Sequence, residues 1–161
     1  MLPCIIDLEA SGFGRGSYPI EVGLCLGDSS SHCFLVRPEE DWQHWDPEAE
    51  KVHGISRDVL VEKGLSVVDI SCRLNNLLKG QVVYTDAWGF DNSWLWTLYD
   101  TAGTYPNFQL EAIRKLLAEN QLAHWMATKK QVIADLNLTR HRASADAHIL
   151  QETYRRIKAK F

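Results

Sequence analysis

The chain has 161 residues, 45% of them hydrophobic and 24% charged, which is typical of one globular domain spanning residues 1–161. No apolar run approaches the ~20 residues that cross a bilayer, and no basic segment precedes a long apolar run as in a secretory signal. The formal net charge of −4 differs from the basic charge more usual in proteins that wrap nucleic acid. We therefore expect a cytoplasmic protein without a membrane partner. Its four scattered cysteines contain no CxxC pair, so we expect reduced, mostly buried thiols, without zinc or disulfides.

The first part of the chain predicts three short strands. Apolar runs with period-two alternation are typical of strands, and they cover residues 5–8, 20–26 and 32–36. A glycine-rich loop follows the first run, and a turn at 27–31 follows the second. These short connections favour an antiparallel meander.

The rest of the chain predicts mostly helices, with two further strands. The expected helices cover residues 47–53, 56–63, 67–79, 90–99, 111–120, 122–136 and 144–160, and the expected strands cover 81–85 and 106–110. Asp46, Ser56 and Ser144 are the expected helix caps. This order predicts an α/β fold: a mixed sheet with helices on its faces, and strands 5–8 and 81–85 in the middle. Functional sites in such folds lie at the carboxyl ends of the central strands.

Asp7 and Glu9 lie at the end of the first apolar run. Side chains alternate along a strand, so both carboxylates project to one face. Burying two carboxylates together is costly unless a cation lies between them, and hard oxygen-liganded ions such as Mg²⁺ or Mn²⁺ suit that place. The alternative is an exposed strand end with two solvated acids.

Asp91 follows the expected strand at 81–85 and opens the next helix. Gly89 permits a tight turn that directs this helix start back toward the first strand. Asp86, closer to the strand end, is the competing candidate. The alternative role for Asp91 is stabilisation of the helix by its dipole.

His141 and Asp146 are separated by five positions, which suits a histidine on a loop and an aspartate in the first turn of the following helix. The alternative is a surface histidine with an acid that complements the helix dipole. Together with the other acids, these residues could hold two divalent cations about 3.5–4 Å apart. Histidine titrates near neutral pH, so His141 could accept a proton from water during in-line hydrolysis of a phosphodiester.

Four separated motifs resemble those of the DEDDh family of 3′–5′ exonucleases, which includes polymerase proofreading subunits and oligoribonuclease. In chain order the motifs are Asp7-Leu8-Glu9 with Ala10-Ser11-Gly12, His53-Gly54-Ile55, Gly89-Phe90-Asp91, and His141 with Asp146. Each motif is weak alone, but the ordered set spans nearly the whole chain.

The resemblance implies a ribonuclease H-like fold with a five-stranded mixed sheet flanked by helices. It also implies a site for two Mg²⁺ or Mn²⁺ ions. Asp7 would bridge both ions, Glu9 and Asp146 would complete the site of the ion that carries the attacking water, and Asp91 would hold the other. His141 would be the general base.

The resemblance further implies a binding site for the terminal nucleotide. The backbone of Ala10 and Ser11 would bond the 3′ hydroxyl, and Phe13 would wedge against a base. His53 and Ile55 would lie nearby, or would simply pack their loop. Ala10 and Ser11 stand where the family commonly has threonines, and Asp86-Ala87 replaces a familiar histidine-asparagine pair.

The expected activity is removal of nucleoside 5′-monophosphates from the 3′ end of single-stranded DNA or RNA, or of a short oligonucleotide. Two alternatives stay open: a phosphodiesterase specific for dinucleotides or small nucleotides, and a non-catalytic relative that binds nucleic acid. Because relatives are often homodimers, a homodimer is also an expectation.

Overall fold

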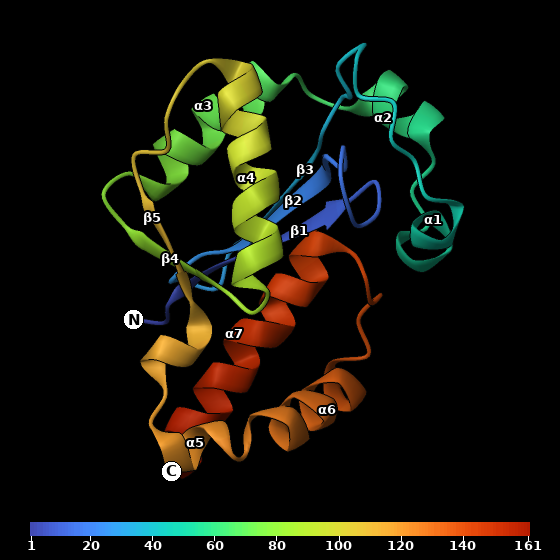
Figure 1. Cartoon of the computed structure of the whole chain (residues 1–161). Coiled ribbons are helices and arrows are strands. Elements are labelled where there is room, and N and C mark those ends of the chain that lie inside the picture. The colour runs from blue at the N-terminus through green and yellow to red at the C-terminus, as the bar shows by residue number, and fades with distance from the viewer.

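A computed structural model describes residues 1–161, and its five strands form one mixed sheet in the order β3-β2-β1-β4-β5 (Figure 1). The strands are β1 (Cys4–Ala10), β2 (Pro19–Cys25), β3 (Ser31–Leu35), β4 (Val82–Thr85) and β5 (Gln109–Ala112). The first three form the expected antiparallel meander, and β4 and β5 add in parallel. The predicted fold class is confirmed, with β1 at the centre of the sheet.

Helices cover both faces of the sheet (Figure 1). On one face, α3 (Val67–Leu78) and α4 (Trp88–Ala102) enclose a core that includes Ile6 and Leu8. On the other face, α7 (Ala143–Lys160) packs on Ile5 and Cys25. The remaining helices are α1 (Pro47–His53), α2 (Arg57–Lys63), α5 (Glu119–Leu122) and α6 (Trp125–Leu136), which packs on α7. The alternation of β1 therefore turns Asp7 and Glu9 toward the α7 face.

Two of the three expected helix caps are confirmed. The Asp46 side chain accepts a hydrogen bond from the backbone of Glu48, and Ser56 accepts one from Val59. The expected cap at Ser144 is wrong, because α7 begins at Ala143 with Arg142 in the cap position. A carboxylate from β2 satisfies the Ala143 N–H instead.

The region after β4 departs most from the sequence prediction. The strand expected at 106–110 lies at Gln109–Ala112, and the helix expected at 111–120 is replaced by the end of β5 and a 3-10 helix over Ile113–Leu116. The parallel ladder with β4 holds residues 111 and 112 extended, overriding their helical tendency. The helix expected from 122 begins at Trp125, and the helix expected from 90 begins at Trp88.

Strand β4 is only partly covered, since Val82 is exposed. The burial prediction for the cysteines is wrong in part. Cys4 and Cys25 are buried, but Cys33 and Cys72 are exposed, and all four thiols are free. None of the helices combines the length and apolar character needed to cross a bilayer.

Candidate active site

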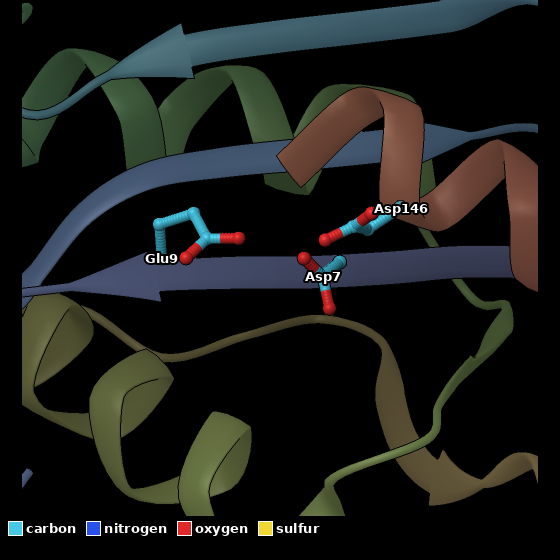
Figure 2. Close-up of side chains that lie close together, drawn as sticks. All are labelled: Asp7, Glu9 and Asp146. Carbon is cyan, nitrogen blue, oxygen red and sulfur yellow. The ribbon is translucent and has the colours of Figure 1, made fainter. Parts of the chain in front are cut away.

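Three carboxylates meet at the carboxyl end of β1 (Figure 2). Asp7 and Glu9 stand on β1, and Asp146 reaches toward them from the first turn of α7. One oxygen from each carboxylate lies within 4.8 Å of the others. Residues from opposite ends of the chain thus form a compact, all-oxygen donor set.

Asp146 is held by the loop that precedes its helix. Arg140 Nε donates to one carboxylate oxygen at 3.0 Å, and the backbone N–H of His141 donates to the other at 3.1 Å. His141 adopts a left-handed backbone with φ of 60°, which is uncommon for a residue other than glycine. The loop and the carboxylate therefore fix one another's orientation.

Asp91 approaches the cluster from the other side of β1. It lies in the first turn of α4, is 2% exposed, and accepts a hydrogen bond from the Thr85 hydroxyl. It lines the same cavity as the three clustered acids. Asp86 does not line the cavity and instead pairs with Lys129 at 2.7 Å.

Burial makes this acidic site electrostatically unfavourable without a cation. Burial, together with Asp91, Glu9 and Asp146, raises the pKa of Asp7 well above its usual range. The pKa of Glu9 rises to about 8, chiefly through burial and then through Asp146, and burial raises the pKa of Asp91 to about 7. A divalent cation would offset this repulsion, and the oxygen-only donors fit Mg²⁺ or Mn²⁺.

The acids open into a half-open cavity of about 510 Å³. Its remaining walls come from the loop after β1, helix α1, the start of α4 and the loop before α7. The lining residues beyond the four acids are Leu8, Ala10, Gly12, Phe13, Ala49, Val52, His53, Ala87, Phe90, Trp94 and His141. His141 therefore shares one cavity with all four predicted metal ligands.

Three aromatic rings in mutual contact line part of the cavity. Phe13 is 67% exposed and contacts Phe90 edge-on, with ring centroids 5.0 Å apart, and Trp94 lies 5.9 Å from Phe13. The exposed ring of Phe13 offers an apolar surface to a planar ligand. The sequence prediction included Phe13 but missed Phe90 and Trp94.

His53 also lines the cavity. It is buried, and its Nδ1 accepts a hydrogen bond from the backbone of Ile55 at 3.0 Å. The proton therefore lies on Nε2, which is buried without a partner. Burial lowers the pKa of His53, so the neutral ring keeps this one donor for a ligand.

Two of the predicted binding residues do not line the cavity. Ile55 is buried in a cluster with Tyr18, Ile20 and Leu60. Ser11 is fully buried, and its hydroxyl bonds to His44 Nδ1 at 2.8 Å and to the backbone N–H of Tyr18 at 3.1 Å. The backbone N–H and carbonyl of Ser11 are also engaged, with Tyr18 and Asp46. Of the residues predicted to bind substrate, the structure therefore brings Ala10, Phe13 and His53 to the cavity.

Comparison with known proteins finds solved structures that share the fold of this chain. No family model matches the sequence, and no curated protein sequence matches it. Among solved structures, the zinc-bound complex of Escherichia coli exonuclease I with single-stranded DNA matches 98% of this chain with a TM-score of 0.77 and 13% identity. Exonuclease I from Methylocaldum szegediense matches 98% with a TM-score of 0.76 and 14% identity. The complex of the E. coli enzyme with a dA16 oligonucleotide matches 98% with a TM-score of 0.73 and 12% identity.

These matches define the fold of the chain as the ribonuclease H-like fold of exonucleases. The chain spans about 40% of the length of each of these three structures. At this level of identity the likeness concerns the fold, and the argument for activity depends on the residues in the cavity.

Proposed function

We propose that this protein is a metal-dependent 3′–5′ exonuclease of the DEDDh type, with residues 1–161 as its nuclease domain. The observation that carries the proposal is the meeting of Asp7, Glu9 and Asp146 within 4.8 Å in a cavity that Asp91 and His141 also line. The exonuclease I structures with the same fold include complexes with single-stranded oligonucleotides, which supports single-stranded nucleic acid as the substrate class.

The acids have separate roles in this proposal. Asp7, Glu9 and Asp146 would hold one divalent ion, and Asp7 and Asp91 would hold a second. Bound Mg²⁺ or Mn²⁺ lowers the pKa of a coordinated water and neutralises charge on the phosphate. The Thr85 hydroxyl would orient the Asp91 carboxylate for this role.

His141 is the proposed proton acceptor. Its backbone N–H bonds to Asp146, and its side chain lines the cavity beside the acids. This backbone bond supports a role for His141 close to the carboxylate that would help hold the attacking water. His141 would take the proton of that water as the new P–O bond forms. The bond from phosphorus to the 3′ oxygen of the preceding nucleotide would break, and this oxygen would leave as the new 3′ hydroxyl after taking up a proton from solvent.

The terminal nucleotide would occupy the remaining walls of the cavity. Phe13 offers a stacking surface for a base, and the unpartnered Nε2 of His53 can donate to a sugar or phosphate oxygen. Ala10 would contact the 3′-terminal sugar. Ser11 and Ile55 would act indirectly, by bonding and packing the loops behind this wall. The cytoplasmic location and the homodimer stay predictions.

A substrate panel tests this proposal. The pure protein is incubated with 5′-labelled single-stranded DNA, single-stranded RNA and a dinucleotide, with Mg²⁺ or Mn²⁺ and with EDTA. We expect a ladder of 5′-labelled fragments shortened from the 3′ end, nucleoside 5′-monophosphate as product, and no product in EDTA. Cleavage of the dinucleotide alone would establish the small-molecule phosphodiesterase instead. Binding of oligonucleotides without hydrolysis in either metal would refute the exonuclease.

A further inference from the structure

Glu21 is a fully buried acid on β2 that lies outside the cavity. Arg142 Nη2 donates to its Oε2 at 2.6 Å, and Arg142 Nε lies 3.1 and 3.0 Å from the two oxygens. The backbone N–H of Ala143 donates to Oε1 at 2.7 Å. One carboxylate thus holds two consecutive residues at the start of α7, and these bonds raise the pKa of Arg142.

The same part of α7 packs against Gly23, two positions further along β2. A Cβ on this glycine would lie 2.1 Å from the Ala143 carbonyl carbon and 2.2 Å from the Ser144 nitrogen. Only a residue without a side chain permits this approach. The backbone at the start of α7 therefore packs directly on the sheet, and its hydrogen bonds to Glu21 hold it in this position.

The register of β1 and β2 places this attachment beside the proposed metal site. Glu21 is the partner of Glu9, and Gly23 is the partner of Asp7. The fastened segment lies between His141 and Asp146. Its position therefore determines where a proton acceptor and a metal ligand lie relative to the two carboxylates on β1.

We propose that Glu21 is a positioning residue for hydrolysis, which acts through Arg142 and Ala143 to place His141 and Asp146 opposite Asp7 and Glu9. This inference rests on the proposed exonuclease function. Glu21 itself touches neither metal nor substrate, because its oxygens are occupied by Arg142 and Ala143. Loss of its charge would loosen the loop and leave the four metal-binding carboxylates chemically unchanged.

The test compares Glu21→Gln with a matched control, Glu152→Gln. Glu152 is also an acid paired with arginines, Arg155 and Arg156, but it lies further along α7. Groups that orient metal ligands typically contribute roughly 10–100-fold to metal affinity or activity. We expect Glu21→Gln to lower kcat on single-stranded DNA and Mn²⁺ affinity by such a factor, with little change in KM. The control should keep wild-type values.

A second readout separates this inference from the nuclease proposal. Histidine-labelled protein gives ring NMR signals, and that of His141 is assigned by its loss in His141→Asn. The His141 signal should shift in Glu21→Gln and stay in place in Glu152→Gln, whether or not the protein is a nuclease. A wild-type protein without Mn²⁺ binding or hydrolysis would refute the exonuclease, whereas the His141 signal would still test the positioning role.

If Glu21→Gln does not fold, Arg142→Lys serves as the second variant, because lysine keeps the charge but loses the two-pronged bond. We expect the same loss of kcat and Mn²⁺ affinity and the same shift of the His141 signal. A folded Glu21→Gln or Arg142→Lys protein with wild-type kcat, Mn²⁺ affinity and His141 signal would overturn the positioning role.

Discussion

Glu9 on β1 lies directly opposite Glu21 on β2, so two acids share one face of an antiparallel pair. Like charges in this arrangement repel. Arg142 forms its ion pair with Glu21, at 2.6 Å. Glu9 has no such partner, and its pKa rises to about 8, chiefly through burial and then through Asp146 and Glu21. Glu21 therefore has a structural role, through its ion pair with Arg142, whereas Glu9 has no paired cation and is available to bind a metal ion.

Asp7→Asn should abolish hydrolysis and also stabilise the metal-free protein. The variant removes a proposed ligand of both ions, so turnover should fall by at least 10²–10³-fold, about the cost of losing one strong electrostatic contact. Without metal, it removes a buried carboxylate that its neighbours repel. Thermal unfolding in EDTA should give an equal or higher Tm than wild type. A lower Tm in EDTA would mean that the Asp7 carboxylate stabilises the fold without a cation.

The stability of the metal-free protein should fall as pH rises from about 4 to 8. Folding raises the pKa of Glu9 to about 8 and of Asp91 to about 7, from ordinary values of 4.5 and 3.8. Between these limits the folded protein binds more protons than the unfolded chain, so stability present at low pH is lost as pH rises. Melting curves in EDTA from pH 5 to 8 measure this loss.

Mn²⁺ should oppose that loss, because metal binding needs deprotonated carboxylates and releases protons. The increase in Tm that Mn²⁺ produces should therefore grow from pH 5 to pH 8. An increase independent of pH would place the ion away from these acids.

His141→Asn should lower turnover with little effect on Mn²⁺ affinity. Asparagine tolerates the left-handed backbone at this position, so the bond from its N–H to Asp146 is retained, but it cannot accept the proton. General bases typically contribute 10²–10⁴-fold, and we expect a loss in roughly that range. His141→Ala should lose activity as well. Full turnover of either variant at neutral pH would show that another group takes the proton.

Asp91→Asn and Asp86→Asn should differ sharply in their effect on hydrolysis. Asp91 is buried at the cavity wall, whereas Asp86 lies outside the cavity and pairs with Lys129. We expect a loss of at least 10²-fold for Asp91→Asn, again about the cost of one strong electrostatic contact, and near wild-type rates for Asp86→Asn. Steady-state kinetics in Mg²⁺ compare the two, and the reverse order would assign the second ion to Asp86.

Phe13→Ala should weaken substrate binding without destabilising the fold, since the ring is 67% exposed. Stacking of a base on an aromatic ring contributes about 1–3 kcal/mol, so KM for an oligonucleotide should rise roughly tenfold or more. Phe161→Ala, at an exposed ring that follows α7 and does not line the cavity, is the control. Equal KM values for both variants would exclude stacking at Phe13.

The acidic cluster was predictable because the directions of its side chains follow from the elements that carry them. Side chains alternate along a strand, so Asp7 and Glu9 lie on one face of β1. Asp146 lies in the first turn of the helix predicted after His141, whose start lies beside these two residues. The binding wall was harder to predict. Ser11 is turned into the interior by its bonds to His44 and Tyr18, partners that sequence spacing does not reveal.

The sequence analysis did not identify Glu21 as a functional residue, although the surrounding sequence indicates that it is buried. It is a lone acid in a strand of otherwise apolar residues, which indicates a buried charge with a partner elsewhere. The end of β5 could not be placed, because Glu111 and Ala112 favour helix and are held extended only by pairing with β4.

The acidic cluster joins Asp7, on the first strand, to Asp146 on α7. During synthesis on the ribosome, the strand that carries Asp7 emerges long before the helix that completes the cluster. Under the proposed function, a nascent chain would therefore be unable to degrade nucleic acid until residue 146 has left the exit tunnel. Transient detachment of α7 from the sheet would make the folded protein inactive in the same way.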